Sequence, residues 1–121
     1  MLMIAGVLLA AALPAVALAS RAPSHSERVQ LRKAVTSSKL VDRSIRSGHF
    51  RLSKPRISAS GRWAKAGIFR SNAYIDPFHA PKGLFKHRGK RWRLVDVGTS
   101  VGCKKPRLSR SVRKDLKLRC R

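Results

Sequence analysis

The clearest alternation of apolar and polar residues lies in the second half of the chain, on either side of Gly89. Leu84 and Phe85 precede this glycine, and a further apolar series begins at Trp92. Aromatic and β-branched residues suit a pleated, half-buried surface, and Gly89 supplies the positive φ that a tight hairpin turn requires. The pattern therefore predicts a β-hairpin within residues 83–103.

Two loop lengths fit this hairpin, and they predict different cross-strand partners for Trp92. A two-residue loop would pair Trp92 with Phe85, whereas a three-residue loop would pair it with Leu84. Because arginine is a poor first residue for a type I′ turn, the three-residue loop is favoured. Either register gives Trp92 an apolar partner, which stabilises the ladder by a few tenths to about 1 kcal/mol. Asp96 falls on the same side as Trp92, and we expect it to pair with one of the many arginines; a catalytic carboxylate is the alternative.

Two more strands are predicted before the hairpin. Residues 62–69 alternate, which places Trp63 on one side and small or aliphatic residues on the other. Residues 49–59 also alternate but are interrupted by Pro55, which lacks a backbone donor and so favours an edge strand or a bulge. Since Trp63 and Trp92 both lie in strands with apolar neighbours, both are expected to be core residues.

Helical patterns flank the strands. Ser24 and Glu27 have the spacing of a capping box, and the apolar positions that follow predict a helix ending near residues 36–38. Residues 40–45 can form a second short helix. Apolar residues recur every four positions from Leu108, which predicts a short helix lying against the sheet. The expected fold class is α+β: an N-terminal helix, a four-stranded antiparallel meander and a C-terminal helix closed by a disulfide.

The first 19 residues carry no charged side chain and end in the small-x-small pattern of Ala17 and Ala19. This is typical of a secretory signal peptide, so we expect cleavage after Ala19 and one domain over residues 20–121. No Lys or Arg precedes the apolar run, and a run of this length could just span a bilayer, so an uncleaved membrane anchor is the alternative. The expected location is therefore secreted or in the cell envelope.

Cys103 and Cys120 are the only cysteines. Export makes a disulfide between them the expected state. Closing a loop of about 18 residues should add roughly 3 kcal/mol of stability by the chain-entropy estimate. Two free thiols and a metal site are the alternatives, but two ligands do not make a zinc site and no histidine is close in sequence. We therefore expect no bound metal.

Part of the chain resembles a group of known proteins. The residues that carry the likeness are Ile57-Ser58-x-Ser60-Gly61-x-Trp63-Ala64, Leu84-x-Lys86, Gly89-x-x-Trp92-Arg93-Leu94-Val95-Asp96-x-Gly98, Gly102-Cys103, Pro106, Leu116 and Cys120. Across roughly residues 50–121 this pattern is similar to small exported actinobacterial proteins of unknown function. The resemblance implies secretion, a helix-flanked sheet and the Cys103–Cys120 bridge. It implies no catalytic or ligand-binding residue.

Few side chains are available for catalysis. There is no glycine-rich phosphate loop, no nucleophile elbow and no His-Glu-x-x-His helix. Glu27 serves the helix cap, while Asp42 and Asp115 sit among basic residues as ordinary helix-face neighbours. We therefore expect a protein that is not an enzyme and binds no cofactor. If a specific pocket exists, it is expected in the irregular segment 70–82, at Tyr74, Asp76, Phe78 and His79.

Charge is the one feature large enough to indicate a function. The chain has 28 Lys and Arg against five acidic residues, a formal net charge of +23. Such a surface attracts polyanions through counterion release, with strong salt dependence and little sequence specificity. A basic composition without selection for binding is the alternative. The expected binding residues come from the hairpin turn and the C-terminal helix: Lys86, Arg88, Lys90, Arg91, Lys104, Lys105, Arg110, Arg113 and Lys114.

An exported chain meets a limited set of polyanions. We expect a monomeric module that binds an anionic cell-wall polymer or an anionic lipid surface. A cationic membrane-active protein is a second interpretation, although the apolar stripe of the C-terminal helix is short. A nucleic-acid binder is the third, and the signal peptide disfavours it.

Overall fold

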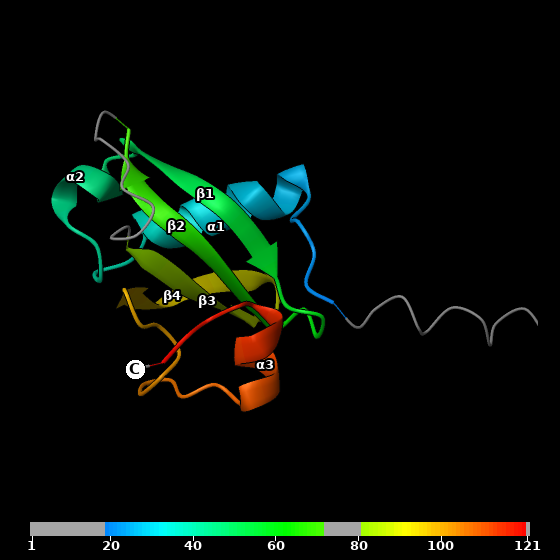
Figure 1. Ribbon diagram of the computed structural model, residues 1–121. Coiled ribbons are helices and arrows are strands. Elements are labelled where there is room, and N and C mark those ends of the chain that lie inside the picture. Colours follow the sequence, from blue (N-terminus) through cyan, green and yellow to red (C-terminus); the bar gives the residue numbers. More distant parts are fainter. Residues whose placement is uncertain (1–18, 72–80, 121) are drawn as a thin grey trace, which may run out of the picture.

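The computed structural model describes residues 19–71 and 81–120, which are arranged in three layers around one sheet (Figure 1). The elements are α1 (His25–Thr36), α2 (Arg43–Arg46), β1 (Phe50–Ile57), β2 (Trp63–Arg70), β3 (Lys82–Arg88), β4 (Arg91–Gly98) and α3 (Arg110–Asp115). The four strands form an antiparallel sheet in the order β1-β2-β3-β4. Helix α1 packs on one face, and the C-terminal segment with α3 packs on the other. The α+β class and the four-stranded meander are confirmed, and residues 1–18 of the expected signal peptide lie outside the described residues.

Helix α1 begins at the expected capping box. The Ser24 hydroxyl accepts from the Glu27 backbone N–H at 3.1 Å, and the Glu27 carboxylate accepts from the Ser24 N–H at 2.9 Å. Its buried face consists of Leu31, Ala34 and Val35. These side chains pack mainly over β4, which fixes the helix across the last strand of the sheet.

Strand β1 is an edge strand with a bulge, as Pro55 indicated. Its register against β2 shifts between Ser53 and Arg56, and Lys54 has a φ of +47°. The bulge absorbs the extra residue, so that one strand continues through the proline instead of ending before it.

The expected register of the β3–β4 hairpin was wrong. Arg88 faces Arg91, so the loop is Gly89-Lys90, and Trp92 faces His87 instead of Phe85 or Leu84. Gly89 has a φ of +58° and occupies the first central position, which is where a type II′ turn takes glycine. The expected apolar partner of Trp92 is therefore replaced by an imidazole ring stacked at 4.4 Å between centroids.

The expected position of Asp96 was also wrong. A register shift beside Leu84 adds one residue to β4, so Asp96 faces Leu84 and lies on the side opposite Trp92. Its carboxylate accepts from the Gly102 backbone N–H at 3.0 Å, and no arginine within residues 19–71 or 81–120 pairs with it. Asp96 thus fixes the turn that leaves β4.

The C-terminal segment forms its own small core on the second face of the sheet. Leu84, Leu108 and Leu116 are buried there with Val101 and Leu118. The predicted disulfide between Cys103 and Cys120 is confirmed, with 5.6 Å between the two Cα atoms. It ties the segment after α3 to the turn segment that follows β4.

The two tryptophans differ in burial. Trp92 is 6% exposed and belongs to the core beneath α1, as expected. Trp63 is only half-buried at the edge of the C-terminal core, with the Lys86 ammonium 5.4 Å from its ring centroid. The sequence prediction therefore holds fully for Trp92 and in part for Trp63.

Candidate anion-binding groove

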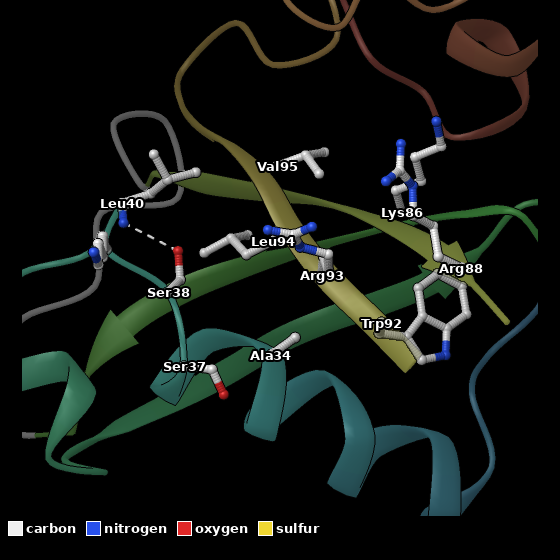
Figure 2. A pocket seen from close by; sticks show the side chains of 11 residues that line it. Ala34, Ser37, Ser38, Leu40, Lys86, Arg88, Trp92, Arg93, Leu94 and Val95 are labelled. Atoms are coloured by element: carbon white, nitrogen blue, oxygen red, sulfur yellow. Dashed lines mark hydrogen bonds between the residues drawn. The ribbon is translucent and has the colours of Figure 1, made fainter. Parts of the chain in front are cut away.

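A groove runs between α1 and the edge strand β4. Figure 2 shows its larger part, with a volume of about 600 Å³, and an adjoining part has a volume of about 450 Å³. Both parts share Ala34, Ser37 and Trp92, so they form one continuous depression, here called the β4 groove. Its lining comprises Gln30, Lys33, Ala34, Ser37, Ser38, Lys39, Leu40, Lys86, Arg88, Lys90, Arg91, Trp92, Arg93, Leu94 and Val95.

The groove exists because β4 has no strand on its outer side. Helix α1 ends at Thr36, and the chain then turns beside β4, where the Ser38 hydroxyl accepts from the Leu40 N–H at 3.0 Å. This turn leaves the Leu40 side chain 54% exposed. The apolar part of the wall consists of Ala34, Leu40, Leu94, Val95 and the indole of Trp92.

The backbone of β4 also faces this opening. The His87 N–H donates to the Arg62 carbonyl on the β2 side at 2.9 Å, so His87 and Trp92 form a non-hydrogen-bonded pair. In an antiparallel ladder the backbone groups of such a pair point away from the partner strand. The N–H and C=O of Trp92 therefore point to the open edge of the sheet.

Among the described residues that line the groove, every charged one is cationic, and none is Asp or Glu. Cations that converge without a carboxylate repel one another, and an anion placed between them relieves that repulsion. The charged residues of the lining are Lys33, Lys39, Lys86, Arg88, Lys90, Arg91 and Arg93.

The carboxylates of the described residues are engaged elsewhere. Glu27 pairs with Arg21 at 2.7 Å, and this hydrogen bond is the main cause that lowers the Glu27 pKa to about 2. The pKa of Asp42 is also lowered to about 2, first by the Ser44 hydroxyl, with the backbone of the α2 cap and Arg70 adding to it. Asp96 and Asp115 accept backbone N–H groups. None of them neutralises the β4 groove.

The groove brings together only part of the surface expected from the sequence. Lys86, Arg88, Lys90 and Arg91 line it. The other expected residues belong to the C-terminal segment, which packs on the face of the sheet that also carries the Lys86 side chain: Lys104, Lys105, Arg110, Arg113 and Lys114. Whether the two sets act as one surface stays a prediction.

Arg113 has a different environment from the rest. Its side chain is half-buried, and its guanidinium donates to the Cys120 sulfur at 3.1 Å. Its Nε is buried without a partner among the described residues. Arg113 therefore packs against the disulfide, while Lys104, Lys105, Arg110 and Lys114 are exposed to solvent.

Sequence reasoning missed the contribution of the first helix to the groove. Lys33 and Lys39 come from the end of α1 and the turn after it, and Arg93 comes from β4 itself. Helical spacing offered one signal, because Lys33 and Ser37 are four residues apart beside the buried Ala34. The missing information was that α1 lies over β4.

A second group of cations lies around Lys65, on the face of the sheet that packs against the C-terminal segment. Lys65 is half-buried and faces Arg56 across the β1–β2 ladder. Its pKa is lowered, first by burial and then by repulsion from Lys82, Lys117 and Arg56. Sequence reasoning did not single out these residues, because strand pairing rather than sequence proximity brings them together.

Several other expectations concern residues outside this region. Tyr74, Asp76, Phe78 and His79 lie outside the described residues. Among the residues that are described, no helix is long and apolar enough to cross a membrane, and no three potential metal ligands cluster together. No protein-family model, curated protein or solved structure matches this chain.

Proposed function

We propose that this protein is a secreted or cell-envelope module that binds anionic polymers without catalysing a reaction, and that the β4 groove is its main contact surface. One observation carries the proposal: the charged residues lining the groove are all Lys or Arg. The disulfide supports export, because such bonds persist in oxidising compartments.

The groove suits a chain better than a small compact ligand. Its lining combines cations from α1 and the turn after it with cations from β3, β4 and the loop between them, and it includes the Trp92 indole. Lysines act as point charges there, and the arginines add the planar fork that matches phosphate and carboxylate oxygens. An anionic cell-wall polymer or a surface of anionic lipid headgroups provides such oxygens at repeated spacing.

The identity of the polymer is tested by measuring binding of the oxidised protein, beginning at Ser20, to three probes at several salt concentrations. The probes are a linear wall-type polyphosphate, vesicles of anionic or neutral lipid, and a DNA duplex. We expect polyphosphate binding that weakens steeply with salt. Leakage of anionic but not neutral vesicles would favour the membrane-active interpretation, and a clear preference for DNA would favour the nucleic-acid interpretation.

A pair of variants with equal charge loss distinguishes binding at the β4 groove from attraction by the net charge of the whole surface. Replacing Arg88, Lys90, Arg91 and Arg93 by Gln removes charge from the groove rim at exposed positions. The control replaces Arg28, Arg43, Arg46 and Arg51, which are equally exposed and do not line the groove. Absence of binding by the unmodified protein near physiological salt would mean that the basicity is only compositional.

A further inference from the structure

Ser20 and Arg21, near the start of the described chain, form hydrogen bonds with residues that are distant in sequence. The Ser20 backbone N–H donates to the Asp115 carboxylate at 2.7 Å. The Arg56 guanidinium donates to the Ser20 carbonyl, and its Nε lies 3.3 Å from the Ser20 hydroxyl. The next residue, Arg21, exchanges two backbone hydrogen bonds with Ile57 at the end of β1. Every hydrogen-bonding group of Ser20 therefore has a partner at the very position where the expected mature chain begins.

Asp115 is well placed to receive a positive charge. It lies half-buried at the end of α3, and its second oxygen accepts from the Ala59 N–H at 2.8 Å. In a chain with a net charge of +23, it nevertheless pairs with no Lys or Arg side chain of the described residues. Both of its oxygens are directed instead at backbone N–H groups from other parts of the fold.

Processing would change the chemical nature of one of these groups. Hydrolysis adds water across the Ala19–Ser20 peptide bond, leaving a carboxylate on Ala19 and an amino group on Ser20. An α-amino group has a pKa of about 7.7–8.0, so it takes up a proton near neutral pH. The neutral amide donor that faces Asp115 thereby becomes an ammonium ion.

We propose that Asp115 is the receiving site for the α-ammonium group that cleavage between Ala19 and Ser20 creates. The inference rests on the cleavage expected from residues 1–19. Maturation then converts a neutral hydrogen bond into a charge-assisted one, which is shorter and stronger. Because Asp115 also holds Ala59, this ion pair joins the mature N-terminus, the β1–β2 turn and α3.

The charges next to Ser20 are cationic. The Arg56 guanidinium is bonded to Ser20, and Arg56 faces Lys65 across the β1–β2 ladder. Like charges disfavour a further ammonium at this place. Asp115 is the carboxylate that contacts Ser20, so removing its charge leaves the new terminus beside the Arg56 guanidinium without a counter-charge.

The test uses four forms of the oxidised chain beginning at Ser20, produced by cutting a fusion protein so that export is not required. The N-terminus is either free or acetylated, since acetylation restores a neutral amide, and position 115 is either Asp or Asn. At pH 7 and low salt we expect acetylation to lower the Tm of the Asp115 chain by several degrees. In the Asp115→Asn chain acetylation should have little effect or the opposite one. Loss of the Ala59 hydrogen bond affects both Asn forms alike, so it cancels.

A pH series covers the case in which the Asp115→Asn chain does not fold. The free and acetylated Asp115 chains are compared between pH 7 and pH 10, where the free amine loses its proton. Their Tm difference should shrink as the pH rises, and side chains that titrate in both forms cancel. Equal Tm values at pH 7, or a difference that does not change with pH, would overturn the inference. Neither result depends on whether the protein is exported or binds a polymer.

Discussion

At the residue scale, burial decides which aromatic side chains stabilise the fold. Trp92 is 6% exposed, packs beneath α1 and stacks on His87. Trp63 is half-buried and has a lysine over its ring. The two residues looked equivalent in sequence because both lie in apolar strands, and only the position of the covering segments distinguishes them.

We predict that Trp92→Ala destabilises the protein by about 3–5 kcal/mol, because it removes a buried indole and leaves a cavity. Trp63→Ala serves as the control and should cost clearly less, since part of its ring is already in water. Urea unfolding followed by circular dichroism measures both. Equal losses would show that the burial difference has no energetic consequence.

Glu27 gives a pH-dependent prediction. Its pKa is about 2 in the folded protein, against about 4.3 in an unfolded chain. A lowered pKa means that the stability it contributes is complete above pH 4.3 and is lost as the pH falls towards 2. The difference in unfolding free energy between the parent protein and Glu27→Gln should therefore shrink over that window. Asp42 titrates at a similar pH in both chains and does not affect the difference. A constant difference from pH 6 to pH 2 would contradict the assignment.

At the scale of elements, local signals predicted most of the structure. Ser24 and Glu27 located the start of α1, Pro55 indicated the bulged edge strand, and the cysteine pair indicated the bridge. The predicted β3–β4 register was wrong because glycine can occupy different positions of a hairpin turn. Each position changes the partner of every residue along the two strands. The side of the sheet predicted for Asp96 was wrong because the extra residue in β4 does not change the pattern of apolar residues in the sequence.

The disulfide should dominate the stability of the C-terminal segment. We expect reduction to lower the unfolding free energy by roughly 3 kcal/mol, the chain-entropy value for a loop of this size. Urea unfolding with and without reductant measures the loss. Mass spectrometry after alkylation without reductant should find both cysteines unmodified. Labelling of both thiols in the protein as isolated would contradict the bridge.

At the scale of the whole molecule, the excess of positive charge is evident from the sequence, but only some of the residues that line the groove could be predicted from it. The hairpin-turn residues were expected, and four of them line the β4 groove: Lys86, Arg88, Lys90 and Arg91. Lys33 and Lys39 were not expected there, because the packing of α1 over β4 depends on contacts between distant parts of the chain. The role of Asp115 was missed for the same reason, since its partners Ser20 and Ala59 are far away in sequence.

We expect cations of the β4 groove to contact the polymer. The slope of log affinity against log salt, measured for three variants of equal charge loss, tests this contact. The groove variant and the control variant are those defined above, and the third replaces Lys104, Lys105, Arg110 and Lys114, which are exposed in the C-terminal segment.

With a DNA duplex as a calibrating polyanion, each lost phosphate contact reduces the slope by roughly 0.9. We predict that the groove variant loses the most slope, with both duplex and polyphosphate, and that the control loses little. A loss in the third variant as large as that in the groove variant would extend the contact surface to the C-terminal segment. Equal losses in all three variants would show that the polymer responds to net charge alone, and the β4 groove would then not be its contact surface.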